Sequence, residues 1–272
     1  MCVKAFLNEK FLTSRKGIIM TNQLFELDGK IAAVTGGTRG IGRAVALGLA
    51  EAGADIALLQ RNPSQINVKE EIEELGRTCH IISCDLNDTD QVKGAIPKVV
   101  ENFGRVDILV NAAGIQRRSD AVDFPEDDWD EVININLKTT WILCQQAGRF
   151  MVPNNGGKII NFASLLSYQG GIRVPAYAAS KGGVSQLTKA LSNEWASQGV
   201  NVNSIVPGYI ATDMNTALIN DENRNQQILD RIPAGDWGRP EDFIGAAIFL
   251  ASEASSYVHG HQLAVDGGWM GR

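Results

Sequence analysis

Short apolar runs alternate with longer amphipathic segments along almost the whole chain. The first run, residues 30–35 (KIAAVT), is almost continuously hydrophobic, which is typical of a strand buried on both faces of a sheet. Segments with helical spacing separate each run from the next, so the pattern predicts βαβ units around a parallel sheet. The predicted strands span residues 30–35, 55–59, 80–84, 107–111, 158–163, 201–206 and 261–265.

The intervening segments predict helices on both faces of that sheet. Pro125 opens the longest of them, and acidic residues follow in its first turn, where the helix dipole favours negative charge. Residues 211–232 are polar and rich in asparagine, and we expect a mobile helical flap there. The other predicted helices span residues 40–52, 64–75, 88–103, 125–151, 175–197 and 240–252.

The organisation of the chain predicts one α/β domain of the doubly wound, Rossmann type over residues 25–272. No linker, repeat or low-complexity segment interrupts it. Residues 1–24 are expected to be a loose extension. Residues 1–19 carry four basic residues and one acidic residue, so an organelle-targeting segment and a start upstream of Met20 are alternatives. Glu9 and the shortage of serine argue against targeting.

Composition and charge exclude several classes of protein. The 272 residues suffice for one large core, and no run reaches the roughly 18 apolar residues of a membrane span. A net charge of −6 argues against a nucleic-acid partner and an anionic membrane surface, but allows an anionic substrate in a local positive pocket. Cys2, Cys79, Cys84 and Cys144 form no CxxC motif, which predicts small core residues, no metal site and a reducing, cytoplasmic compartment.

The strongest chemical signal is Y-A-A-S-K, in which Tyr177 and Lys181 stand four residues apart. Four residues make about one helical turn, so the phenol and the ammonium are expected on one helix face. A phenol has a reference pKa of about 10, and a fixed ammonium nearby should pull that pKa toward the working pH. With Ser164 holding a carbonyl oxygen, the trio suits proton transfer to or from an alcohol oxygen.

A hydride carrier is expected at the glycine-rich turn T-G-G-T-R-G-I-G, which follows the first strand and opens a helix. That context aims backbone N–H groups at a pyrophosphate. Gly36 would make the tight turn, Gly40 would admit the phosphates and Gly42 would let the helix pack on the strand. The spacing is G-x-x-x-G-x-G, which indicates a particular branch of dinucleotide folds.

The end of the second strand bears on the choice of nicotinamide. An acidic residue usually stands there to bind the ribose 2′-OH of NAD, but this chain has Gln60 followed by Arg61. Arg39 and Arg61 are planar donors suited to a 2′-phosphate. NADP(H) is therefore favoured, while NAD(H) stays possible if both arginines face solvent.

These motifs resemble the short-chain dehydrogenase/reductase family over residues 25–272. The resemblance implies a seven-stranded sheet, a nicotinamide cofactor and a tetramer or dimer. It implies Tyr177 as general acid-base, Lys181 on the ribose, Ser164 orienting substrate and Asn136 holding a relay water. The family more often has asparagine at Ala112. Cofactor contacts are implied for Gly36, Thr38, Arg39, Gly40, Ile41, Gly42, Gln60, Arg61, Asp85, Leu86, Asn111, Ala112, Gly114, Tyr177, Lys181, Pro207, Gly208, Ile210 and Thr212.

Longer stretches, residues 158–181 above all, resemble the 2-deoxy-D-gluconate 3-dehydrogenase and 2-dehydro-3-deoxy-D-gluconate 5-dehydrogenase subfamily. A sugar acid carries a carboxylate, which suits a guanidinium, so Arg118 or Arg173 is the candidate partner and Arg117 a further one. Each could equally be a surface charge. A broad carbonyl or 3-oxoacyl reductase and a non-catalytic dinucleotide sensor are the alternatives. Trp237 and Trp269 are expected to pack the flap or an interface.

Overall fold

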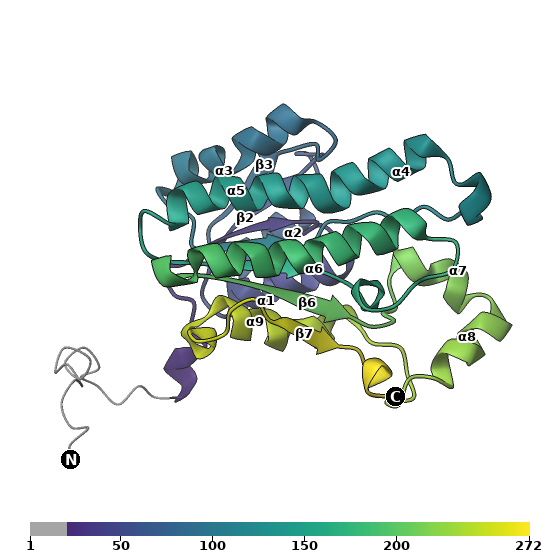
Figure 1. The fold of residues 1–272 in the computed structure, drawn as a ribbon. Coiled ribbons are helices and arrows are strands. Elements are labelled where there is room, and N and C mark those ends of the chain that lie inside the picture. The colour runs from purple at the N-terminus through teal and green to yellow at the C-terminus, as the bar shows by residue number, and fades with distance from the viewer. Residues whose placement is uncertain (1–20) are drawn as a thin grey trace, which may run out of the picture.

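A seven-stranded parallel sheet forms the centre of the computed structural model, which describes residues 21–272 (Figure 1). The strand order is β3-β2-β1-β4-β5-β6-β7, so the order reverses between β1 and β4. The doubly wound fold predicted from the apolar runs is confirmed. The strands are β1 Ile31–Thr35, β2 Asp55–Gln60, β3 Cys79–Ser83, β4 Ile108–Asn111, β5 Gly157–Phe162, β6 Val200–Pro207 and β7 Gln262–Val265.

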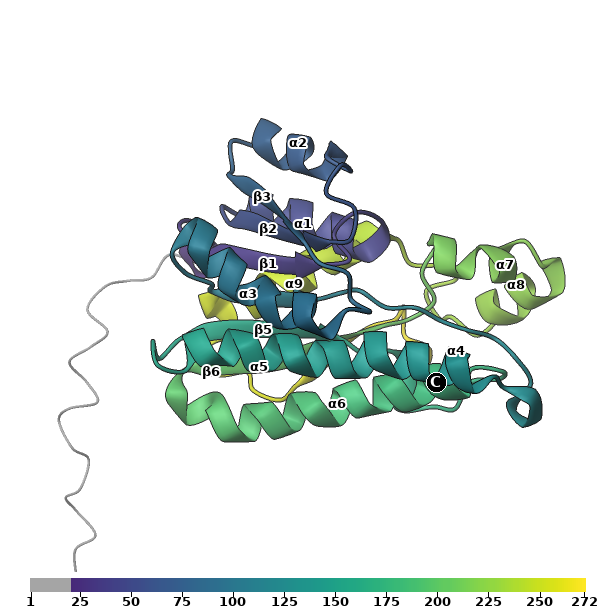
Figure 2. The same cartoon turned by 90° about the horizontal axis from the view of Figure 1, so that it is seen from above.

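Helices cover both faces of the sheet, with α1 and α9 on one side and α3, α5 and α6 on the other (Figure 2). A buried apolar cluster lies on each side: one includes Val45 and Leu250, the other Ile96 and Leu143. The helices are α1 Gly40–Glu51, α2 Asn67–Glu74, α3 Thr89–Phe103, α4 Glu126–Ile133, α5 Thr139–Met151, α6 Pro175–Trp195, α7 Thr216–Ile219, α8 Glu222–Leu229 and α9 Ile244–Ala251.

The helix predicted over residues 125–151 differs from the prediction in its middle. A π-helical turn, Asn134–Lys138, separates α4 from α5. Such turns widen the backbone by one residue and are frequent at functional sites. The π turn contains no glycine or proline, so the sequence gives no local signal for it. The wide turn holds Asn136, which is almost fully buried.

The segment predicted as a helical flap is two short helices, α7 and α8, rather than one. It lies beyond the carboxyl ends of the strands, toward which the arrows point in Figure 1. Ile228 and Ile232 anchor it in a third apolar cluster that also contains Trp269. The segment 240–252 likewise begins as a 3-10 turn, Pro240–Phe243, before α9.

Several sequence-based predictions concern residues 1–19 and Cys2, which lie outside the described residues. The other cysteines are buried and unpaired, as predicted for core residues. Burial raises the pKa of the Cys144 thiol to about 12. In the part of the chain that the structure describes, no helix is long and apolar enough to cross a membrane.

Candidate active site

The glycine-rich turn lies at the point where the strand order reverses, against the end of β4. Gly36 has φ +69°, and a Cβ built on it would lie 2.9 Å from the Ala113 Cα. A Cβ on Gly42 would lie 2.2 Å from the Gly36 carbonyl oxygen. Both positions therefore accept only glycine, which keeps the turn, the start of α1 and the end of β4 in close contact.

The first residues of the flap segment reach this turn. A Cβ on Gly40, which has φ +54°, would lie 3.6 Å from the Thr212 Cγ2. The Arg39 guanidinium forms an exposed ion pair with Asp213 at 3.3 Å. The turn and the first residues of the flap segment are therefore in direct contact beside the place expected for a cofactor.

The Gln60 side chain, at the end of β2, turns into the protein and bonds the loop that follows the strand. Its Nε2 donates to the carbonyl oxygens of Asn62 and Gln65, and the residue is buried. Its Oε1 is buried with no hydrogen-bond partner among residues 21–272. Arg61 is exposed and forms no ion pair with the described residues. The Gln60 amide therefore shapes the loop that presents Arg61.

Asn111, which is expected to contact the cofactor, has a side chain that is engaged within the core. The Nδ2 donates to Asn161 Oδ1 at 2.9 Å on the neighbouring strand, and the side chain is buried in the core. Asn161 continues the chain of bonds to the Thr188 hydroxyl in α6. Only the backbone of Asn111 remains for a ligand. Asp85 Oδ1 accepts from the Asn87 N–H and so forms a local turn.

Tyr177 and Lys181 stand in the first two turns of α6, and Ser164 lies two residues beyond the end of β5. Lys181 is 4% exposed, its Nζ donates to the Phe162 carbonyl at 2.7 Å, and it lies 5.7 Å from the centroid of the Tyr177 ring. Ser164 lies close enough to Tyr177 to lower the pKa of its hydroxyl, and the Ser164 Oγ accepts from the Leu166 N–H at 3.2 Å. The structure therefore brings the three predicted groups together.

The pKa predicted for Tyr177 is wrong in direction. Burial of the hydroxyl raises this pKa above its ordinary value, and the hydrogen bond with Ser164 only partly opposes the effect. Burial also lowers the pKa of the Lys181 ammonium to about 8. The four-residue spacing is as expected, but the Lys181 ammonium donates to the Phe162 carbonyl, and desolvation of the phenolate is the largest effect on the Tyr177 pKa.

Asn136 ties the loop after β4 to α6. Its Oδ1 accepts from the Ile115 N–H at 2.9 Å, and its Nδ2 donates to the Ile115 carbonyl and to the Ser180 hydroxyl. A Cβ on Gly114 would lie 3.4 Å from this Oδ1 and 3.6 Å from Lys181 Nζ. Gly114 therefore leaves the gap in which Asn136 and Lys181 approach each other.

The three candidate arginines have different partners. Arg117 pairs with Asp128 at 3.6 Å and Glu131 at 2.7 Å on α4, so it supports the helix. Arg173 pairs with Asp120 at 2.9 Å and holds φ +65°, a strained value for a residue other than glycine. Within residues 21–272, Arg118 reaches only the neutral Gln116 Oε1, at 3.4 Å. Its guanidinium is therefore the least committed of the three.

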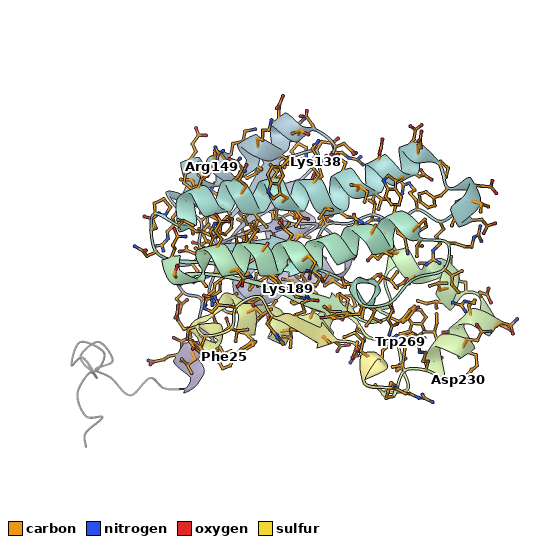
Figure 3. The ribbon with its side chains drawn as sticks, in the orientation of Figure 1. Phe25, Lys138, Arg149, Lys189, Asp230 and Trp269 are labelled. Carbon is orange, nitrogen blue, oxygen red and sulfur yellow. The ribbon has the colours of Figure 1, made fainter. Side chains whose placement is uncertain are left out.

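Trp269 connects the flap segment to the loop after Ser164. Its Nε1 donates to Gln169 Oε1 at 3.1 Å, its ring lies 4.6 Å from that of Tyr209, and the Arg231 guanidinium lies 4.2 Å above it. Trp269 lies near Asp230 at the flap end of the molecule (Figure 3). The prediction that Trp269 packs the flap is confirmed. Gln169 and Tyr209 were missed, because nothing in their local sequence marks them.

The fold and these groups define an oxidoreductase of the dinucleotide-binding α/β class. The family model described as enoyl-(acyl carrier protein) reductase matches residues 36–270. The chain belongs to the short-chain dehydrogenase/reductase family, as the motifs predicted.

Curated relatives are similar over nearly the whole chain. The chain is 54% identical over 252 residues to a 2-dehydro-3-deoxy-D-gluconate 5-dehydrogenase of Pseudoalteromonas atlantica, covering 91% of this chain and 98% of the relative. It is 49% identical over 249 residues to the protein of the same name from Escherichia coli, with the same coverage. The resemblance to that subfamily is confirmed.

Solved structures agree with the fold. A gluconate 5-dehydrogenase from Burkholderia cenocepacia, solved in complex with NADP and tartrate, is 39% identical with a TM-score of 0.89, covering 93% of this chain and 100% of that one. A protein of Agrobacterium tumefaciens with bound NADP is 47% identical with a TM-score of 0.86, covering 92% and 99%.

Proposed function

We propose that this protein is an NADP(H)-dependent dehydrogenase that interconverts a secondary alcohol and a ketone on a sugar acid of the (deoxy)gluconate type. The observation that carries the chemistry is the convergence of Tyr177 and the buried Lys181 beside the end of β5, at the carboxyl edge of the sheet, with Ser164 next to them. The relatives at 49–54% identity support the substrate class.

The residues at the switch point fit a dinucleotide. Glycines 36 and 42 leave a turn into which a Cβ would not fit, and the backbone N–H groups that open α1 suit a pyrophosphate. No acid ends β2, and the exposed Arg61 suits a 2′-phosphate, as would Arg39 once released from its ion pair with Asp213. When bound, the nicotinamide would supply or accept the hydride. Support for NADP(H) also comes from the two solved relatives that contain it.

The proton steps belong to the protein. The Tyr177 hydroxyl would give its proton to the substrate oxygen in reduction and take it back in oxidation, while the Ser164 hydroxyl steadies the charge on that oxygen. Lys181 would stabilise the phenolate and bind the ribose. Both donors of the Asn136 amide are engaged, so a relay water held by Asn136 would have to donate to one of its oxygens.

Arg118 is our leading candidate for the substrate carboxylate, because Arg173 already has Asp120 as its partner. Arg118→Ala should raise KM for an acidic substrate by about tenfold or more, since a bond between charged groups is lost, and should leave KM for a neutral ketone unchanged. Arg117→Ala is the matched control. An equal loss with both substrates would contradict this role.

The test of the proposed function is a turnover assay with NADPH and NADH in parallel, against keto-sugar acids and neutral or bulky ketones. Activity on the acids with NADPH supports the proposal. Activity only on neutral or acyl ketones would leave the oxidoreductase class intact and favour a broad carbonyl or 3-oxoacyl reductase. Cofactor binding without turnover on any substrate would favour a sensor.

A homotetramer is also proposed, built on the faces of α4, α5 and α6. Trp129 on α4 and Trp141 on α5 remain 40% and 42% exposed in the single chain, as expected for residues that another copy would cover. Light scattering at micromolar protein gives the mass directly. A clean monomer mass would contradict the proposal.

A further inference from the structure

A hollow of about 760 Å³ lies at the edge of the sheet opposite the candidate active site. Its lining includes Lys30, Asp107, Lys158 and Gly199, which stand at the amino ends of β1, β4, β5 and β6. Phe25, which directly precedes the lining residue Glu26, lies far from Trp269 in Figure 3. The hollow is within the size range of small-molecule sites and is separate from the cofactor cradle.

Lys158 is the buried cation of this hollow. It is only 8% exposed, and its Nζ donates to Asn201 Oδ1 at 3.0 Å. Among residues 21–272 it forms no ion pair with a carboxylate. An ammonium has three N–H donors, so one neutral oxygen leaves two to be satisfied. A buried charge in that state is unfavourable unless a counter-charge approaches it.

The side-chain amide of Asn201 is held in one orientation. Its Nδ2 faces the carbonyl oxygens of Ser255, Ser256 and Val258 at 2.9–3.3 Å. The amide orientation is fixed by these acceptors, so its oxygen must face Lys158. The ammonium is therefore held at one place in the wall of the hollow.

The other charges around the hollow are exposed or already paired. The Asp107 carboxylate accepts from the Ile31 N–H at 2.9 Å and from Arg105. Glu253 is exposed and raises the pKa of Lys158, but burial, with a small contribution from Lys30, lowers that pKa overall. Two more groups that titrate line the hollow, the exposed Glu26 and the half-buried His259.

We propose that this hollow binds a small carboxylate- or phosphate-bearing molecule whose anionic group is held by the Lys158 ammonium. Asn201 accepts from one of the three N–H donors of the Lys158 ammonium, and the oxygens of the anion would accept from the other two. Lys30 gives further positive charge at the rim, where the exposed Glu26 and Glu253 oppose it, while Arg105 is already paired with Asp107. The proposal does not depend on the function proposed for the opposite edge of the sheet.

The test is isothermal titration of the full chain with citrate and with inorganic phosphate in separate experiments at constant ionic strength. Lys158→Met should weaken saturable binding of at least one probe by about tenfold or more, because a charge-assisted bond is lost. The matched control is Lys93→Met, which removes an exposed lysine of α3 and should bind as the wild type does.

The probe whose binding weakens in Lys158→Met shows whether the bound anionic group is a carboxylate or a phosphate. Saturation of the wild type with NADP beforehand removes anion binding at the cofactor cradle from the signal. Equal affinity in the wild type and Lys158→Met, or unsaturable uptake in both, would overturn the proposal. Circular dichroism checks folding, and Lys158→Gln serves the same purpose if the methionine variant does not fold.

Discussion

Lys158 stands at the amino end of β5 and Lys181, in α6, lies at the carboxyl end of the same strand, and these two buried lysines differ in what faces them. Lys181 at the carboxyl end donates to the Phe162 carbonyl, and Lys158 at the amino end donates to Asn201 Oδ1. Burial lowers the pKa of both ammonium groups. A phenol lies beside Lys181, whereas Lys158 faces a hollow. A lowered lysine pKa therefore reports burial, and only the neighbouring groups indicate a function.

The Tyr177 hydroxyl is the neighbouring group that distinguishes Lys181 from Lys158, so its removal should have the largest effect. Tyr177→Phe should lower kcat by about 10²–10⁴-fold, because the proton donor is lost while the ring and its packing remain. NADPH oxidation at saturating substrate measures this, and cofactor titration should give an affinity near that of the wild type. Turnover within threefold of wild type would show that another group moves the proton.

The same substitution at the two lysines should separate their roles. Lys181→Met should lower kcat by roughly 10²–10³-fold, because the charge that stabilises the phenolate is lost. Lys158→Met should leave kcat unchanged, since its ammonium lies at the other edge of the sheet. Steady-state kinetics of both variants under identical conditions gives the contrast. Equal losses would mean that both act through the stability of β5.

The stability of the fold should vary with pH through both lysines. A folded-state pKa below the ordinary 10.5 means that the native state binds fewer protons, so unfolding free energy rises with pH in that window. For Lys181 the window runs from about 8 to 10.5 and is worth on the order of 3 kcal/mol. Below about pH 8 its full penalty is present.

Urea unfolding at pH 7 and pH 9.5 checks this directly. The wild type should gain stability with pH relative to Lys181→Met, and relative to Lys158→Met in the same direction. Lys93→Met, an exposed control, should follow the wild type. If the unfolding free energy of the wild type fell relative to that of the two methionine variants as pH rises, the folded-state pKa values of these lysines would not be lowered.

A contact remote from both lysines should have the smallest effect. Trp269→Phe keeps the ring against Tyr209 but removes the bond to Gln169 Oε1, which is worth about 1 kcal/mol. We expect a rise in KM of a few-fold with kcat nearly unchanged, because the flap segment loses one tie to the loop after Ser164. Gln169→Leu should reproduce the effect. A loss of kcat instead would place the tryptophan in the catalytic step.

Much of this fold follows from local patterns. Continuous apolar runs locate the strands because a central parallel strand is buried on both faces. Spacing alone also places Tyr177 and Lys181 on one face of α6. Gly36 and Gly42 follow from the backbone demands of the turn, since any side chain would strike a backbone atom.

The remaining features depend on contacts between distant segments. Asn111 turns inward because Asn161 stands opposite it on the next strand. The Arg173–Asp120 pair joins two loops 53 positions apart, which no local pattern encodes. The raised pKa of Tyr177 and the isolation of Lys158 depend on which atoms exclude water, and this emerges only from packing.

The π turn at Asn134–Lys138 depends on the exact number of residues between α4 and α5. Each residue of an α-helix turns the chain by about 100°. The wide turn absorbs one extra residue, so loss of one residue here would restore regular winding with Leu143 and Cys144 of α5 still facing the sheet, but it would move Asn136 away from Ile115 and Ser180. Single-residue deletions accumulate in surface loops over evolutionary time. We expect this helix to exclude them, although its ends are exposed to solvent.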